Sequence, residues 1–350
     1  MEINECSDMK RQALKKATVQ DVAAIANVSV ATVSRSLSKP DKVSEKTRQL
    51  VLDAVKQTGY TVNEAARSLR RQRTDTIVIL LPNIGNSVFS NVVEGIEKVF
   101  AANNINVLIA DTQKASIATE NAHAYFSQNK VDGMVILDGL VTLDNLTSPN
   151  NPLPIVFAGE WQEESGYPIV RVDDLLGSKL VAEHLTTLGH RKLGHVTGPL
   201  SHLPGKTRKQ GFAAALKDLG VASSNIWQYE ADFNLESGKA AAKAWYALNP
   251  EDRPTGIFCA GDEIAFGFLS TLHQLGIKLP EEVSVVGYDD LDVAGYFVPS
   301  LTTVHQPRRQ LGELAAHTLL SMIQGETYAS PQPIEPYLVV RDSTTSAPKH

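Results

Sequence analysis

The sequence is poor in cysteine and has no long apolar run. Its 350 residues contain two cysteines, Cys6 and Cys259, too few for a disulfide framework or a cysteine-rich zinc site. No apolar run approaches the ~18 residues of a membrane helix. Residues 1–16 are polar and lack the apolar segment of a signal peptide. We therefore expect a soluble protein of the reducing cytoplasm.

The motifs of several enzyme classes are also missing. The chain has no Gly-Xaa-Ser-Xaa-Gly elbow, no Walker phosphate loop and no Gly-Xaa-Gly-Xaa-Xaa-Gly fingerprint. His184, His190 and His195 are close in sequence, but their spacing matches no zinc pattern. We expect no enzyme activity, no metal site and no cofactor.

The composition is that of a globular chain with an uneven charge. Hydrophobic residues make up 43% and charged residues 21%, and the length suggests two or three domains at about 100–200 residues each. Residues 1–75 carry 14 basic and 9 acidic side chains, a net of +5, whereas the remainder carries 19 and 30, a net of −11. This asymmetry indicates that only the N-terminal part meets a polyanion, with a solvated basic tail as the alternative.

Three short helices are predicted in the N-terminal part. Thr18 begins a capping-box pattern with Asp21, and Ser29 is a good N-cap for a second helix over 30–37. Ser44 caps a third helix, whose buried stripe is expected to include Leu50, Val51, Ala54 and Val55. A three-helix module follows from this pattern.

From residue 75 onward, strands and helices alternate. Apolar runs of strand length occur at 76–81, 106–110, 133–137, 154–158, 169–172, 192–197, 226–229, 256–259 and 283–287. Helical patterns lie between them, for example at 89–103, 175–188, 207–219 and 263–275. The alternation predicts parallel α/β sheets in two similar lobes. Ligands of such sheets bind beyond the carboxyl ends of the strands.

The chain resembles the lactose-repressor/galactose-repressor (LacI/GalR) family of bacterial transcription factors nearly from end to end. The specific part is the run from Thr18 to Arg35, which is similar to that family's helix-turn-helix signature. Ala-Ala-Arg-Ser-Leu at 65–69 is similar to its hinge helix. Leu-Gly-His-Arg-Lys-Leu-Gly at 188–194 and Val-Ser-Val-Val-Gly-Tyr-Asp-Asp at 283–290 are similar to its core motifs.

The resemblance implies an all-α helix-turn-helix DNA-binding head and an α/β two-lobed, periplasmic-binding-protein-like core with parallel sheets. The expected parts are a leader (1–17), the head (18–62), a hinge (63–74), the core (75–342) and a tail (343–350). Within the core, the N-lobe would hold about 75–172 and 306–326, and the C-lobe about 173–305 and 327–342. The implied function is a sequence-specific regulator, foremost a repressor, that binds a pseudo-palindromic operator as a homodimer under control of a small-molecule effector. A solute-binding receptor without a DNA role is the alternative.

The second helix of such a head lies in the major groove. Arg35 can reach guanine or a phosphate, whereas Val30 and Ala31 can contact thymine methyl groups. In the family, a leucine at the position of Leu69 unstacks a central base step; the alternative is an ordinary linker residue. The residues expected to contact DNA are Thr18, Ser29, Val30, Ala31, Thr32, Ser34 and Arg35 in the head, and Asn63, Ala66, Arg67, Leu69 and Arg70 in the hinge.

Effector contacts are likewise implied by the resemblance. Carboxylates can accept hydrogen bonds from hydroxyl groups, an arginine can donate to oxygens, and aromatic rings can stack on a sugar or a base. Helix capping for the aspartates and plain core packing for the phenylalanines are the alternatives. Lys206 and His202 near Arg208 would suit an acidic or phosphorylated sugar, and Phe89 and Trp161 could hold the base of a nucleoside. A sugar, a sugar acid or a nucleoside is therefore expected. The expected effector contacts are Asn86, Phe89, Trp161, Arg208, Phe233, Asp262, Asp289 and Gln306.

Overall fold

The computed structural model describes residues 17–61, 73–112, 131–141, 143, 153–160, 165–328 and 331–348. The chain divides into two compact units, residues 1–72 and 73–350, called the head and the core below. Among the helices of the described ranges, none is long and apolar enough to cross a membrane.

The head is a bundle of three helices around a small apolar core. Its helices are α1 (Val19–Ala26), α2 (Val30–Ser38) and α3 (Glu45–Thr58), with a 3₁₀ turn at Pro40–Lys42. The capping box predicted at Thr18 and Asp21 is confirmed. Val22, Val33 and Val51 are fully buried at its centre. Leu50, expected in the buried stripe, is exposed because its neighbour Val51 takes the inward position on α3.

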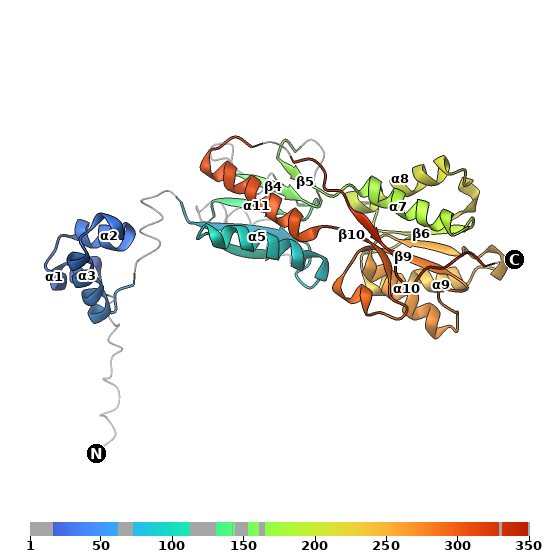
Figure 1. The fold of residues 1–350 in the computed structure, drawn as a ribbon, viewed down its shortest axis with the longest axis horizontal. Helices are drawn as coiled ribbons and strands as arrows, with labels where there is room; N and C mark the ends of the chain where they lie inside the picture. The colour runs from blue at the N-terminus through green and yellow to red at the C-terminus, as the bar shows by residue number, and fades with distance from the viewer. Residues whose placement is uncertain are drawn as a thin grey trace, which may run out of the picture. The chain divides into compact units, whose positions relative to one another are not determined.

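The first lobe of the core, the N-lobe, is a parallel sheet in the order β2-β1-β3-β4-β5. Two helices, α5 and α11, pack against each other beside this sheet (Figure 1). They are far apart in the sequence, because the whole C-lobe up to β10 lies between them along the chain. Gly312 of α11 permits this contact, since a Cβ there would lie 2.1 Å from the carbonyl oxygen of Val92. The elements are β1 (Thr76–Leu81), α5 (Ser90–Ala102), β2 (Asn106–Asp111), β3 (Gly133–Ile136), β4 (Ile155–Ala158), β5 (Ile169–Val170) and α11 (Arg308–Gln324).

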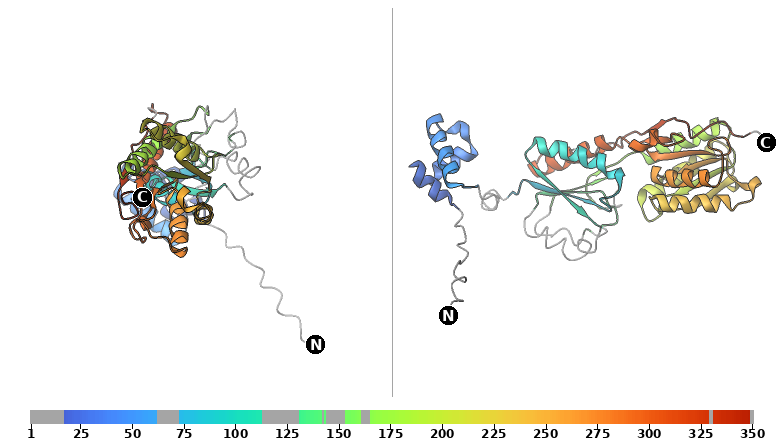
Figure 2. Two further views of the ribbon diagram at one scale, coloured as in Figure 1. Left: turned by 90° about the vertical axis from the view of Figure 1, so that its right-hand side faces the viewer. Right: turned by 90° about the horizontal axis from the view of Figure 1, so that it is seen from below.

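The second lobe, the C-lobe, is a six-stranded sheet in the order β11-β10-β9-β8-β6-β7. All its neighbouring strands are parallel except β11, which runs antiparallel to β10. Helices α7 and α8 form one packed pair, and α9 and α10 form another (Figure 2). The elements are α7 (Asp174–Thr187), β6 (Leu193–Thr197), α8 (Leu203–Asp218), β7 (Ile226–Glu230), α9 (Leu235–Tyr246), β8 (Gly256–Cys259), α10 (Asp262–Gln274), β9 (Ser284–Asp289), β10 (Thr302–His305) and β11 (Tyr337–Val339).

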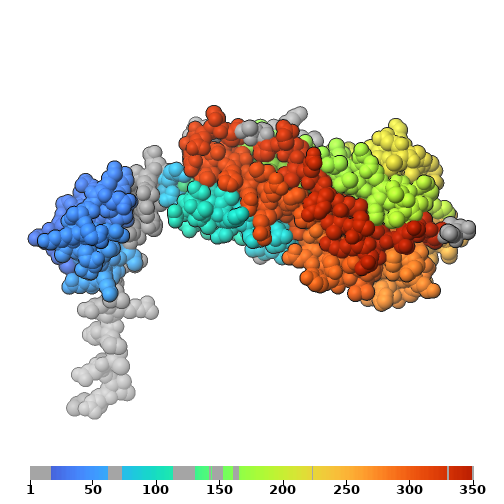
Figure 3. Space-filling view, viewed as in Figure 1, coloured from blue at the N-terminus to red at the C-terminus, as the bar shows by residue number. Residues whose placement is uncertain are grey.

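The chain crosses between the lobes after β5, after β10 and again before β11. Of the residues expected to form a C-terminal tail, the described ones, 343–348, lie against the C-lobe (Figure 3). Ser343 is fully buried and its hydroxyl donates to the carbonyl of Val285 at 2.6 Å. The amide of Ala347 donates to the carbonyl of Leu188 at 2.8 Å. Hydrogen bonds to the backbone of the C-lobe hold this segment in place. A polar composition does not reveal such contacts in advance.

Candidate functional site

Helix α2 of the head presents an exposed face that carries apolar and charged side chains. Ser29 is its N-cap and accepts a hydrogen bond from the amide of Thr32 at 3.1 Å, which fixes where the helix begins. Val33 and Ser36 point into the head, whereas Val30, Ala31 and Arg35 are exposed. The face of α2 opposite Val33 and Ser36 is therefore the part of this helix that is accessible to a partner such as DNA.

Several hydroxyl groups of residues expected to contact DNA form hydrogen bonds within the head. The hydroxyls of Ser29 and Thr32 are hydrogen-bonded to each other at 2.8 Å. The hydroxyl of Thr18 donates to Asp21 Oδ2 at 2.8 Å within the capping box. The hinge residues named from the sequence, Asn63, Ala66, Arg67, Leu69 and Arg70, lie outside the described residues.

A cavity of about 440 Å³ lies between the two lobes of the core. It is bounded by residues that follow the carboxyl ends of β1, β4, β6, β7, β8 and β9, where ligands of parallel sheets bind. Of the expected effector residues, Trp161 is outside the described ranges. The cavity brings together six of the others: Asn86, Phe89, Arg208, Phe233, Asp289 and Gln306.

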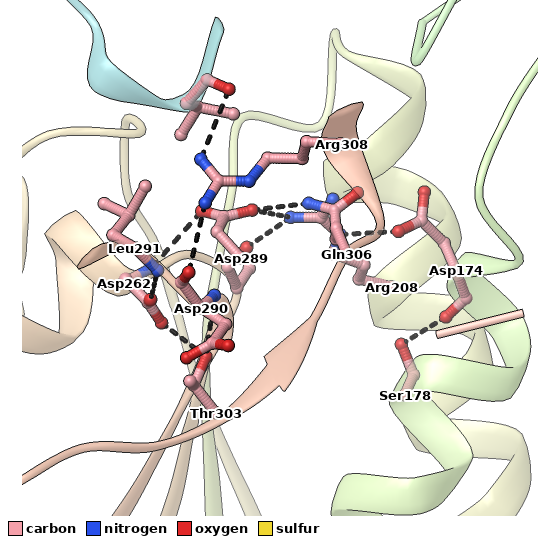
Figure 4. Close-up of polar contacts among 12 residues, drawn as sticks. Asp174, Ser178, Arg208, Asp262, Asp289, Asp290, Leu291, Thr303, Gln306 and Arg308 are labelled. Atoms are coloured by element: carbon pink, nitrogen blue, oxygen red, sulfur yellow. Dashed lines mark hydrogen bonds and ion pairs between the residues drawn. The ribbon is translucent and has the colours of Figure 1, made fainter. Parts of the chain in front are cut away.

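Arg208 on α8 is a buried cation of this cavity, and two of its five N–H groups donate to protein oxygens. Its side chain is 7% exposed, its Nε donates to Asp174 Oδ1 at 2.8 Å, and its Nη1 donates to the carbonyl of Ala260 at 2.7 Å (Figure 4). The guanidinium lies 3.8 Å from the centre of the Tyr288 ring. Burial lowers the pKa of Arg208, but Asp174 and its other neighbours outweigh this and raise it above the ordinary value. The charge is permanent and fixed in position.

Asp289, at the end of β9, is held in a strained conformation. Its φ of 124° is one that side-chain-bearing residues rarely adopt, at a cost of about 1–3 kcal/mol. Gln306 donates to Asp289 Oδ1 at 2.5 Å, and Arg208 Nη1 lies 3.8 Å from the same oxygen. Burial raises the pKa of Asp289, while Arg208 and Arg308 oppose that shift. Gln306 therefore holds this carboxylate at the wall of the cavity.

Asp262 differs from the expectation, because it does not line the cavity. It is fully buried at the first turn of α10, where Thr303 donates to Oδ1 at 2.5 Å and the amide of Leu291 donates to Oδ2 at 2.8 Å (Figure 4). Burial and the nearby Asp289 raise its pKa well above the ordinary value. Its contacts tie the start of α10 to β10 and to the loop after β9, which is a structural role.

Glu160 and His202 join the two lobes at the cavity. Glu160 follows β4 of the N-lobe, and both its carboxylate oxygens lie 3.0 Å from Nδ1 of His202, the N-cap of α8 in the C-lobe. The amide of Leu203 also donates to Glu160 Oε1 at 3.2 Å. The hydrogen bond to Glu160 raises the pKa of His202. Lys206, expected beside His202, is exposed and is absent from the lining.

The sequence reasoning missed several residues of the cavity lining, among them Arg308 and Glu263. Arg308 is buried at the start of α11, and its Nη2 donates to the carbonyl of Asp290 at 3.0 Å. Its position directly after the Gln306 crossover was an available signal. Glu263 gave none, because acidic residues in the first turn of a helix are common.

The three neighbouring histidines have structural places. His190 is hydrogen-bonded to Thr255 at 2.9 Å and to the carbonyl of Thr345 at 3.1 Å. His195 is stacked on Phe258, and burial lowers its pKa to about 3. No group of three or more His, Cys, Asp or Glu side chains suited to a metal ion occurs within the described part of the chain.

The head exposes helix α2, and the core has a cavity between its two lobes. These are the two parts of a DNA-binding regulator that responds to a small molecule. Residues 18–63 match the family described as "Bacterial regulatory proteins, lacI family", and residues 182–344 match the periplasmic binding protein-like domain. The HTH-type transcriptional repressor PurR of Photobacterium profundum is 32% identical, over 93% of this chain and 98% of that protein. The repressor CytR of Escherichia coli is 33% identical, over 95% and 97%.

A solved structure of the lac repressor dimer, bound to operator and the anti-inducer ONPF, matches with a TM-score of 0.84. It is 27% identical, covering 95% of this chain and all of that one. The chain belongs to the lacI family of bacterial transcriptional regulators. Its relatives are repressors and not enzymes, and nothing in them favours a receptor without a DNA role.

Proposed function

We propose that this regulator binds a pseudo-palindromic operator as a homodimer in the cytoplasm, with α2 of each head in the major groove. The exposed face of α2 supports this proposal, since Arg35 can donate to guanine while Val30 and Ala31 contact thymine methyl groups. The predicted hinge would add a minor-groove contact through Leu69. A two-fold protein would then require a two-fold site.

The effector would bind in the inter-lobe cavity and change the relative stability of two arrangements of the lobes. The residues that line the cavity come from both lobes, so a bound molecule contacts both sets only when the two lobes are close together. A ligand shifts such an equilibrium only by its difference in affinity for the two states. Arg208, Asp289, Gln306, Phe89 and Phe233 are the residues we propose to contact it.

The C-lobe also offers a surface for the second copy. Tyr296 and Val298, in the loop after η6 (Asp292–Gly295), are 88% and 86% exposed, and Val293 nearby is also exposed. Exposed apolar side chains gathered in one segment mark an interaction site. Tyr296→Glu should therefore shift the protein toward monomer in analytical ultracentrifugation; an unchanged dimer would place the contact elsewhere.

Selection of bound duplexes from a random DNA pool, repeated with a panel of metabolites, tests the whole proposal. We expect an enriched inverted repeat whose recovery changes with at least one metabolite. Leu69→Ala should reduce the bend of that operator while leaving the base preference of α2 in place. Recovery of no inverted repeat under any condition would refute the proposal.

A further inference from the structure

The N-terminus of helix α8 in the C-lobe is capped by a residue of the other lobe. His202 is the N-cap by position, but its side chain makes no capping hydrogen bond to the helix. The amide of Leu203 donates instead to Glu160 Oε1 at 3.2 Å, and Glu160 follows β4 of the N-lobe. A carboxylate at this end of a helix also interacts favourably with the helix dipole. This cap therefore exists only while the two lobes are close together.

The same carboxylate contacts the side chain of His202. Both of its oxygens lie 3.0 Å from His202 Nδ1. Among the residues that the structure describes, every hydrogen bond of the Glu160 carboxylate goes to the C-lobe. The side chain of Glu160 is 10% exposed and that of His202 is 24% exposed, so both are largely removed from water. Separation of the lobes would break all of these contacts together and return both groups to water.

The carboxylates around His202 favour its protonated form. The hydrogen bond with Glu160 raises the pKa of His202 most, burial opposes that shift, and the negative charges of Glu160, Asp138 and Asp232 add to it. Glu160 and Asp138 belong to the N-lobe, since they follow β4 and β3. Separation of the lobes would therefore remove much of the interaction that keeps the imidazole charged.

Positive charges near His202 do not cancel this preference. On the same helix, Lys206 is exposed, and Arg208 is paired with Asp174 at 2.8 Å. The pKa of His202 is raised in the presence of both. The other charged side chains of the cavity lining are Glu263, Asp289 and Arg308.

We propose that Glu160 and His202 form a proton-dependent latch that holds the two lobes together in the chain without effector. The latch is strongest at a pH below about 6.5, where His202 is charged, and it weakens as the pH rises through the raised pKa. The neutral imidazole can still donate one hydrogen bond, so only the charged part of the interaction is lost. This inference rests on the two lobe arrangements proposed above and gives their equilibrium a second control besides the effector.

Single-molecule energy transfer within the full chain measures the lobe arrangement directly. Glu97→Cys in α5 and Lys217→Cys in α8 place one dye on each lobe at exposed positions. Cys6→Ser removes a second site for the dyes, and Cys259 is buried. An excess of unlabelled protein ensures that no dimer carries two labelled chains.

Without effector, we expect two populations whose ratio of closed to open molecules depends on pH. The ratio should fall about twofold to fivefold between about pH 6 and about pH 9, as for a partly exposed charged pair. His202→Gln should give at both pH values a ratio near that of the parent protein at about pH 9. Glu160→Gln keeps an acceptor for the Leu203 amide but removes the charge, and it should weaken the pH dependence.

His273→Gln is the matched control, because this histidine is also on a helix of the C-lobe but is exposed and outside the cavity lining. It should behave as the parent protein. A ratio that ignores pH, or a pH dependence that persists in both Glu160→Gln and His202→Gln, would overturn the latch and leave the effector role standing. If a panel of metabolites also left the distances unchanged, the two lobe arrangements of the proposed function would fail as well.

Discussion

The inter-lobe pair of Glu160 and His202 makes a sharp prediction about stability and pH. Replacing His202 by Gln keeps a group that can donate to Glu160 but removes the positive charge. Glu160, Asp138 and Asp232 all face His202 and favour its protonated form. The variant should therefore lose the charged part of the interaction and little else.

The magnitude follows from the geometry. A hydrogen bond to a charged group contributes about 1.5–3 kcal/mol when well buried. The side chain of His202 is 24% exposed and that of Glu160 10%, so solvent reduces this to roughly 1 kcal/mol. For a unit the size of the core, that change lowers the melting temperature by about 2–4 °C.

The pH dependence has a definite sign. The folded state raises the pKa of His202 above its ordinary value of 6.5, so the stabilisation is complete below that value. It is lost as the pH rises through the raised pKa. Scanning calorimetry should therefore show the largest deficit of His202→Gln near about pH 5.5, and a much smaller one near about pH 9.

Lys206→Gln provides the control, because it removes a positive charge from an exposed position in the first turns of the same helix. Its melting temperature should follow that of the parent protein at both pH values. An equal deficit of His202→Gln at acid and alkaline pH would refute the reasoning, since a packing defect does not titrate.

Three further outcomes can be measured. Arg35→Ala should weaken binding to the selected operator more than binding to random DNA, by about 1–3 kcal/mol; equal losses in a filter-binding assay would mean that Arg35 contacts only phosphates. Arg208→Ala should destabilise the core by about 3–5 kcal/mol in denaturant unfolding, because it strands the buried carboxylate of Asp174; normal stability would show that Asp174 finds another partner. Gly312→Ala should cost about 1–3 kcal/mol by forcing α5 and α11 apart, and an unchanged unfolding midpoint would contradict the close contact with Val92.

Strands β1 to β9 were predictable to within a few residues, for a simple reason. Parallel strands buried on both faces are continuous apolar runs, as in β1 and β8. β11 was not predicted, since it is a short edge strand with an exposed tyrosine at its start. Helix α8 begins earlier than expected, at Leu203, because a proline in its first turn is compatible with the helix.

The cavity was predicted in part. Residues placed just after strand ends, such as Asp289 and Phe233, do line it. Asp262 also follows a strand, but its side chain turns away to bind Thr303 and Leu291. Position along the chain fixes where a backbone lies, whereas the direction of a carboxylate depends on donors brought in from other strands.

The sequence by itself determined the class of protein and the order of its head, hinge and core along the chain. Capping residues, turn residues and hydrophobic period act over a few positions, so they are readable locally. The tertiary structure alone decided which charged groups meet at the cavity: that Asp174 pairs with Arg208, that Gln306 donates to Asp289, and that Glu160 reaches His202 across the lobes. Those pairings join residues far apart in sequence, and the free energy of each depends on burial that only the folded chain creates.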